Sequence, residues 1–159
     1  MPPIPLVAII AILLAPVPVH SPDRVALNDI VGTWQSDTVG GTSARSVCAA
    51  SPGGMAVICE QRIFSPTGAR TAVNIFMVDS AANRYAYYGI NQVGTPIRPA
   101  ELAISDHIWI YGGNPKGADG KYSRTVNDFS AGTWYVWRVE TSADGVNWTT
   151  VRQGRAVRQ

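Results

Sequence analysis

The stretch Ile30-Val-Gly-Thr-Trp-Gln-Ser36 sets the interpretation of the whole chain. Its β-branched and aromatic residues predict a strand, and the residues from Pro22 to Asn28 predict a short helical turn before it. After Ser36, short apolar or alternating runs are separated repeatedly by Gly, Pro, Asn and Asp, the residues that tight turns require. We therefore expect this strand to begin a series of strands joined by short turns.

The remaining strands are expected in sequence order, without intervening helices. They are Ser43 to Ala50, Met55 to Phe64, Arg70 to Val78, Arg84 to Ile90, Ile97 to Ser105, Ile108 to Tyr111, Lys121 to Phe129, Thr133 to Thr141 and Val146 to Gln153. No window has a helical period long enough for the crossover that parallel strands need, so the sheet should be antiparallel. Closure removes both free edges of such a sheet. The sequence thus predicts an all-β fold, an up-and-down meander of about 8–10 strands closed into a barrel, with a β-sandwich as the alternative.

The composition of the chain excludes several classes of protein. A length of 159 residues indicates one folded domain, and a hydrophobic content of 46% disfavours disorder. The net charge of +2 lacks the basic excess that is typical of nucleic-acid binding. Two cysteines and two histidines are too few for a disulfide-dense scaffold or a cluster of metal ligands, so no metal or cofactor is expected.

Residues 1–21 contain no Asp, Glu, Lys or Arg, and they include an apolar run of ten residues from Leu6 to Ala15. This run has the length of a signal-peptide core and is shorter than the ~20 residues of a membrane span. We expect residues 1–21 to be a signal peptide or N-terminal hydrophobic segment of a secreted or periplasmic protein, with residues 22–159 as the folded domain. The alternatives are an uncleaved membrane anchor, which is the only membrane contact expected, and a buried core segment.

Cys48 and Cys59 flank the turn Ser51-Pro-Gly-Gly54. Because proline has no N–H to donate, a four-residue loop over residues 52–55 fits better than a two-residue turn. Strand pairing then places the two cysteines directly opposite each other in a close, non-hydrogen-bonded pair, with Cα atoms ~4.5 Å apart. We predict a disulfide between them, on condition that the chain is exported. The alternative is a pair of reduced core residues.

The tripeptide Gly32-Thr33-Trp34, at the start of the first strand, resembles the Gly-x-Trp signature of the calycin superfamily, which includes lipocalins and fatty-acid-binding proteins. The resemblance implies that Trp34 plugs one end of the barrel and packs against an arginine of the last strand, here Arg152. A guanidinium that stacks on an indole contributes ~0.5–2 kcal/mol. The alternative is an ordinary core tryptophan that follows a tight glycine.

The later half of the chain resembles a family of secreted bacterial lipocalin-like proteins of unknown function. The resemblance rests on Ile108-Trp-Ile-Tyr111, on Asp119-Gly-Lys121 and on Glu140-Thr-Ser-Ala-Asp-Gly-Val-Asn-Trp148. It covers roughly residues 30–152. These motifs belong to hairpins, so they specify a fold better than a function, and the resemblance implies no reaction.

Charged and aromatic residues within the strands are candidate ligand contacts. Strand alternation could direct Arg124 or Arg138 into the barrel, where an arginine would orient a carboxylate or phosphate; the alternative is an outer face or a structural ion pair. Tyr87, Trp109 and Tyr111 are expected to line the interior, because a barrel of this size packs side chains or holds one small ligand. We therefore expect a non-enzymatic protein that binds a small apolar or amphipathic ligand.

Two other functions stay open. A barrel enzyme of isomerase or cyclase type would need inward polar groups such as Glu60 with Tyr87 or His107, and a structural envelope protein would have a filled barrel. Nucleophilic catalysis lacks support, because no Gly-x-Ser-x-Gly motif is present. His107 is a candidate haem ligand by resemblance to nitrobindin-like barrels, with an ordinary turn histidine as the alternative. The sequence does not indicate an oligomeric state.

Overall fold

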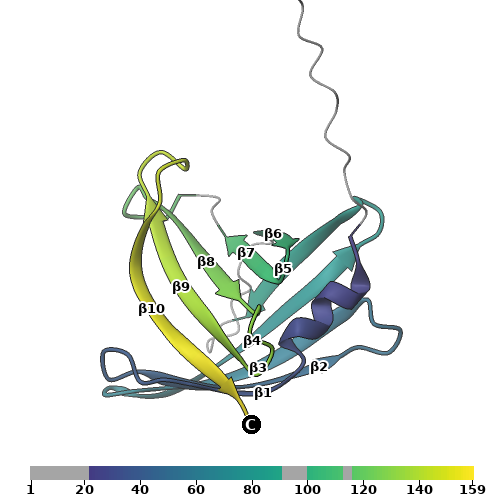
Figure 1. Ribbon diagram of the computed structural model, residues 1–159. Helices are drawn as coiled ribbons and strands as arrows, with labels where there is room; N and C mark the ends of the chain where they lie inside the picture. Colours follow the sequence, from purple (N-terminus) through teal and green to yellow (C-terminus); the bar gives the residue numbers. More distant parts are fainter. Residues whose placement is uncertain (1–21, 91–99, 113–115) are drawn as a thin grey trace, which may run out of the picture.

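A computed structural model describes residues 22–90, 100–112 and 116–159 of the protein (Figure 1). Within these residues, a short 3₁₀ helix, η1, precedes ten strands that form one closed antiparallel barrel. Each strand pairs with its neighbour in sequence, and the first strand pairs with the last. The prediction of an antiparallel β-barrel is therefore confirmed, and the alternative of a sandwich is not the fold that forms. The expected signal segment, residues 1–21, lies outside the described residues.

The elements are η1 (Arg24–Ile30), β1 (Gly32–Ser36), β2 (Ser43–Ala50), β3 (Ala56–Ser65), β4 (Gly68–Asp79), β5 (Arg84–Ile90), β6 (Ala100–Ser105), β7 (Ile108–Gly112), β8 (Tyr122–Asp128), β9 (Trp134–Ser142) and β10 (Thr149–Arg158). The bounds of β2 and β5 are those expected, and most other ends differ by one or two residues. The expected start of β6 at Ile97 lies outside the described residues. The largest difference concerns β10, because a loop organised by the Asp144 carboxylate delays its start and the C-terminal residues continue its pairing.

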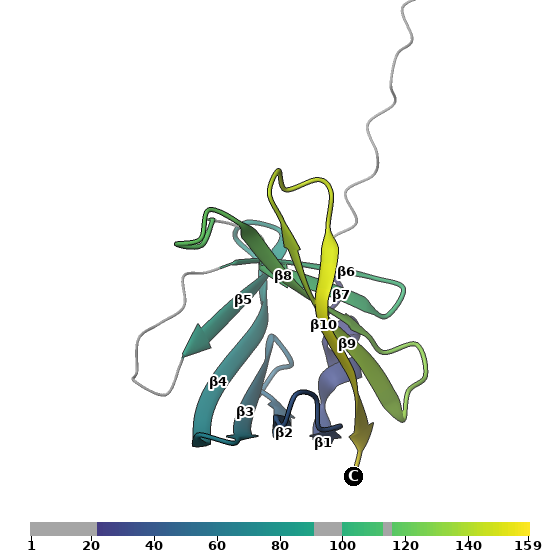
Figure 2. The same cartoon turned by 90° about the vertical axis from the view of Figure 1, so that its left-hand side faces the viewer.

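The hydrophobic core fills one end of the barrel, which we call the closed end. It is the end at which β1, β3, β5, β7 and β9 begin. Helix η1 lies beside β3 and β4 there, as Figures 1 and 2 show, and buries Leu27 and Ile30. The rings of Trp34, Phe129 and Tyr135 pack against one another with centroids 4.6–6.0 Å apart. Among the described residues, no helix has the length and hydrophobicity that a membrane crossing needs.

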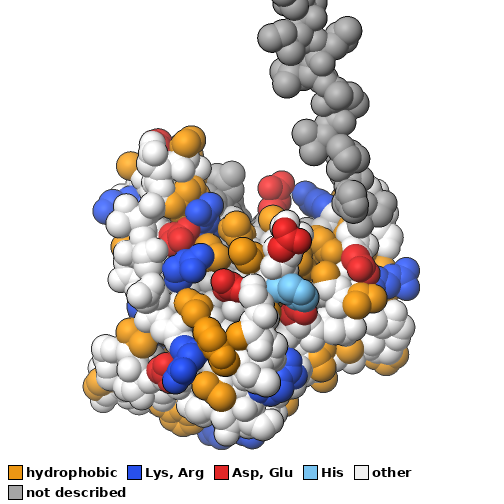
Figure 3. All heavy atoms as spheres, viewed as in Figure 1, with side chains coloured by type: hydrophobic (Ala, Val, Ile, Leu, Met, Phe, Trp, Pro, Cys, Tyr) orange, Lys and Arg blue, Asp and Glu red, His pale blue; other side chains and the backbone are white. Residues whose placement is uncertain are grey.

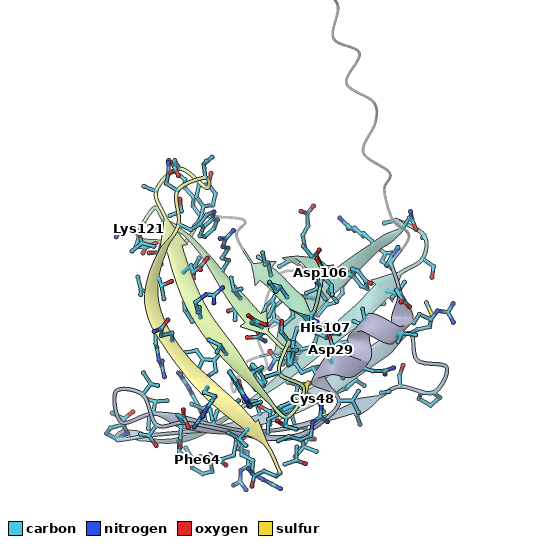
Figure 4. All side chains as sticks on the ribbon, viewed as in Figure 1. Asp29, Cys48, Phe64, Asp106, His107 and Lys121 are labelled. Carbon is cyan, nitrogen blue, oxygen red and sulfur yellow. A yellow bond between two sulfur atoms is a disulfide. The ribbon has the colours of Figure 1, made fainter. Side chains whose placement is uncertain are left out.

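The predicted disulfide between Cys48 and Cys59 is confirmed. The two residues are direct partners across β2 and β3, both are buried at the closed end, and their Cα atoms are 4.0 Å apart (Figure 4). The Ser51 N–H donates to the Ala56 carbonyl at 2.8 Å, which closes the expected loop over residues 52–55. A buried disulfide is typical of proteins that fold in an oxidising compartment.

Trp34 closes this end of the barrel, but the arginine beside it is Arg158 and the expectation of Arg152 is wrong. The Arg158 guanidinium lies 4.3 Å from the centre of the Trp34 ring, whereas Arg152 lies over Trp137 at 5.4 Å. The physical reason is the antiparallel pairing of the first and last strands, which places the start of β1 beside the end of β10, with Trp34 opposite Arg158. A Cβ atom at Gly32 would lie 2.6 Å from Arg158 Nη1, and the φ of +130° at Gly32 also requires glycine.

Candidate functional site

A cavity of about 280 Å³ occupies the half of the barrel away from η1, which we call the barrel cavity. Five aromatic residues line it: Trp34, Tyr87, Tyr111, Tyr135 and Trp137. Eight neutral polar residues line it: Ser36, Thr42, Ser43, Ser46, Gln61, Asn74, Thr125 and Asn127. Arg70, Arg152 and the aliphatic residues Ala44, Ile63, Val139 and Ala156 complete the lining. The interior is thus divided into a packed apolar half and a hollow polar half.

The floor of the barrel cavity is aromatic. The rings of Tyr87 and Tyr111 lie 4.7 Å apart, and the Phe76 ring lies 5.2 and 5.3 Å from them on the side of the closed end. Burial raises the pKa of the Tyr111 phenol far above its usual range and raises the pKa of Tyr135 to about 12. Both phenols are therefore neutral at physiological pH and can donate a hydrogen bond to a ligand.

Amide side chains hold the tyrosines of the floor in place. The Tyr87 hydroxyl donates to Asn74 Oδ1 at 2.8 Å, and the Tyr111 hydroxyl accepts from Asn127 Nδ2 at 3.3 Å. Because the Tyr111 oxygen acts as an acceptor here, its own proton stays available for another acceptor. The floor thus combines tilted aromatic rings with hydroxyl and amide groups that form hydrogen bonds.

Two arginines, Arg70 from β4 and Arg152 from β10, stand at the exposed mouth of the barrel cavity. No Asp or Glu is among the cavity-lining residues that the structure describes. Within the described residues neither arginine forms an ion pair, and Arg152 instead stacks on the Trp137 indole. The mouth is therefore positively charged without internal compensation, and it favours an anionic group.

Arg124 and Arg138 do not face the cavity, so the expectation of an inward arginine at either position is not met. Cavity-lining residues such as Thr125 occupy the opposite face of the same strands. The Glu140 carboxylate lies 2.7 Å from Arg124 Nε and 3.5 Å from Arg138 Nε, and Arg124 also stacks on Trp148 at 4.1 Å. The alternative interpretation, a structural ion pair on the outer face, describes these residues.

The three predicted aromatic contacts are divided between the two halves of the barrel. Tyr87 and Tyr111 line the cavity, whereas Trp109 is fully buried between Phe76 and Phe129 at the closed end, each ring 5.2 Å away. Trp109 therefore supports the floor without reaching a ligand. Sequence reasoning missed Arg70 as a cavity residue, although it shares strand parity with Phe76, an apolar residue that must point inward.

The groups considered for catalysis do not converge. Glu60 is exposed on the outer face of β3, because its neighbour Gln61 points into the cavity and successive strand residues alternate between the two faces. The His107 side chain is 63% exposed, lies in the turn between β6 and β7 and has its Nδ1 3.0 Å from Asp29 Oδ2 of η1 (Figures 3 and 4). Positive φ angles of 47° and 66° at Asp106 and His107 define this turn, as the ordinary interpretation of His107 expects. In the part of the chain that the structure describes, no group of three His, Cys, Asp or Glu side chains could hold a metal ion.

Comparison with known proteins assigns no family: no protein-family model matches the chain, and no curated protein matches it. The closed antiparallel barrel of ten strands is consistent with a calycin-like fold. The barrel cavity is therefore the feature of the structure that indicates a function.

Proposed function

We propose that this protein is an exported calycin-like barrel that binds a small amphipathic ligand, with an anionic group of the ligand at the cavity mouth. The observation that supports the proposal is a hollow half-barrel with an aromatic floor, neutral hydrogen-bond donors and two arginines at its rim that form no ion pair among the described residues. Burial of the apolar part of the ligand contributes about 0.8 kcal/mol for each CH₂ removed from water. The arginines orient the anion and steer it toward the mouth.

The size of the cavity limits the ligand. At about 280 Å³ it lies just below the ~300–1,000 Å³ that is usual for small-molecule sites. The aromatic floor and the small volume favour a compact ring compound over a long acyl chain. A structural protein with a filled barrel would bind neither class of compound.

The experiment compares phenylacetate with its neutral analogue phenylacetamide, using isothermal titration calorimetry and tryptophan fluorescence. We expect phenylacetate to bind more tightly and its affinity to fall with added salt, because the rim charges are solvent-exposed. Arg70→Gln and Arg152→Gln should each weaken phenylacetate binding by about three- to tenfold. The matched control is Arg155→Gln, which removes an arginine on the outer face of β10 that pairs with Asp37.

The outcomes separate the parts of this proposal. Equal affinity for the two probes would contradict the anionic group and leave the ligand-binding barrel in place. An equal effect of Arg155→Gln would show that the charge acts through the whole molecule and not through the cavity mouth. Failure of both probes and of a broader set of ring compounds to bind would contradict the ligand-binding function.

Export is supported by the composition of residues 1–21 and by the buried disulfide. We expect the mature chain to begin between Ala15 and Asp23, where the apolar run ends. N-terminal sequencing of secreted material measures this position. An intact Met1 on protein recovered from the cytoplasm would contradict export.

A further inference from the structure

The outer face of β2 to β5 is unusually apolar for the outside of a barrel. Ile58, Ile75 and Tyr88 form one row across β3, β4 and β5, and Val73 with Ile90 continues a second row beside it. This is the outer face, because the residues that alternate with it along β4, such as Asn74 and Phe76, line the cavity or the core. Val47 extends the second row on β2; we call Val47, Ile58, Val73, Ile75, Tyr88 and Ile90 the outer apolar face.

Exposure confirms that this face is open to solvent. Val47 and Ile58 are each 44% exposed and Ile90 is 38% exposed, which are high values for aliphatic side chains. The outer face of β8 and β9 differs, since it carries the ion-paired Arg124 and Glu140. Figure 1 shows these two groups of strands on opposite sides of the molecule, so this ion pair lies away from the outer apolar face. A contiguous apolar patch of this kind is typical of an interaction surface.

Three charged residues lie within or beside the outer apolar face. Glu60 sits in the second row, directly between its cross-strand neighbours Val47 and Val73. Arg45 and Arg62 are direct cross-strand partners on the same outer face, an arrangement of like charges that is unfavourable. Among the described residues, none of the three forms an ion pair.

We propose that the outer apolar face binds a second copy of this chain, with Glu60 of each copy paired to the Arg45–Arg62 pair of the other. In a two-fold contact the same surface serves both partners, so it must be complementary to itself. This face supplies the apolar rows, one carboxylate and two guanidinium groups, and therefore meets that requirement. A lipid surface would bury Glu60 in an apolar medium without a partner, which is costly.

The area of the face sets the strength of the contact. Four strands spaced ~4.8 Å apart and two rows, which span about four residues of strand length, give an apolar area on the order of 250 Å². A standard interface buries ~800 Å² on each partner, so the apolar rows would form its centre and the charged residues its rim. The dimer should therefore be of modest affinity and depend on protein concentration. It does not depend on the ligand proposed above.

Sedimentation velocity of the full chain over a wide concentration range tests the proposal. We expect a monomer–dimer equilibrium whose dissociation constant rises by more than about tenfold in Ile58→Lys. The matched control is Val146→Lys, at a 77% exposed valine in the β9–β10 loop, which should leave the equilibrium unchanged. Near- and far-ultraviolet circular dichroism verify that each variant is folded.

A charge exchange tests the partner directly. Glu60→Arg and Arg62→Glu should each weaken self-association, because each places like charges opposite one another across the two-fold contact. An equimolar mixture of the two variants should recover dimers, since each copy then faces its complement. Recovery in the mixture and loss in the separate variants is a result that a general folding defect cannot produce.

Three outcomes would overturn the proposal. The first is a chain that is monomeric at every concentration. The second is a dimer that is insensitive to Ile58→Lys and to the charge exchange, which would use another surface. The third is a monomer that cosediments with phosphatidylcholine vesicles through Ile58, which would assign the face to lipid.

Discussion

Replacement of Trp34 by alanine should be among the most destabilising single changes in this barrel. The side chain is 1% exposed and packs edge-on against Tyr135 and Phe129 at ring distances of 5.0 and 6.0 Å. Helix η1 and both terminal strands surround it, so the space cannot collapse easily. We expect Trp34→Ala to lower the free energy of unfolding by ~3–5 kcal/mol, the range for large-to-small changes in a core.

The indole N–H of Trp34 contributes separately from its packing. It donates to the Ile30 carbonyl at 2.7 Å and thereby ties β1 to the end of η1. Trp34→Phe keeps much of the ring and leaves this buried carbonyl without its donor. Its expected cost is ~1–3 kcal/mol.

Arg158 should be energetically coupled to Trp34, because its guanidinium stacks on the indole and also donates to the Val31 carbonyl. Arg158→Ala should cost ~1–2 kcal/mol through lost stacking and hydrogen bonding. The double variant should be less destabilised than the sum of the single variants by about 1 kcal/mol. Arg152→Ala is the matched control: Arg152 belongs to the same strand but contacts Trp137, so its effect should add to that of Trp34→Ala.

Urea unfolding followed by far-ultraviolet circular dichroism measures all of these variants in the disulfide-bonded protein. The coupling free energy is obtained from a double-mutant cycle for each arginine. Strict additivity for Arg158, or coupling that appears only with Arg152, would refute the closure of the barrel described here. Losses below ~0.5 kcal/mol for Trp34→Ala would show that Trp34 is not a core residue.

Three further predictions concern single groups. Replacement of Cys48 and Cys59 by serine should lower the free energy of unfolding by about 3 kcal/mol, and thiol titration of the unfolded, unreduced protein should find no free thiol. Hydrogen bonds from the Asn147 backbone and neighbouring groups hold the pKa of Asp144 far below its usual range. The ionised form therefore stabilises the hairpin above about pH 4, and Asp144→Asn should flatten the acid limb of a stability–pH curve. Burial raises the pKa of Tyr135 to about 12. The neutral phenol therefore stabilises the folded state below pH ~10, and this stabilisation is lost as the pH rises through 12. The difference in absorbance titration between wild type and Tyr135→Phe measures this pKa.

Much of the fold could be predicted from the sequence, because local signals and global topology agree. Turn residues between β-branched runs located the strands, and the absence of a crossover helix required antiparallel order. The disulfide followed from hairpin geometry, since the loop closed by Ser51 and Ala56 fixes the alignment of Cys48 with Cys59. The bounds of β10 were wrong because Asp144 builds a loop from side-chain hydrogen bonds, which alternation alone does not show.

The site was less predictable, because a shift of one residue in strand parity exchanges the inner and outer faces. Alternation alone allows Arg124 and Arg138 to face the cavity, but both pair with Glu140, which lies opposite Arg124 and two residues from Arg138 on β9. Arg70 and Arg152 face the cavity because they alternate in step with buried residues of their strands, such as Phe76 and Ala156. The pairing of the strands in the closed barrel decides which of the two alternating sets faces inward. Residue propensities thus predict where a strand forms, whereas the closure of the barrel determines which side of that strand faces inward.

The polar lining of the barrel cavity is itself an argument for binding. An apolar void of 280 Å³ would, at ~24 cal/mol per Å³, cost about 7 kcal/mol, comparable to the stability of a whole domain. A barrel that only had to be stable would place leucine or isoleucine at inward positions such as Ser46, Gln61 and Asn74. Amides and hydroxyls at these positions lower the cost of an unfilled interior, because polar surfaces can be solvated. The packed closed end, with its disulfide and Trp34, supplies the stability that this hollow half lacks, and the chain thereby keeps a space that a ligand can enter.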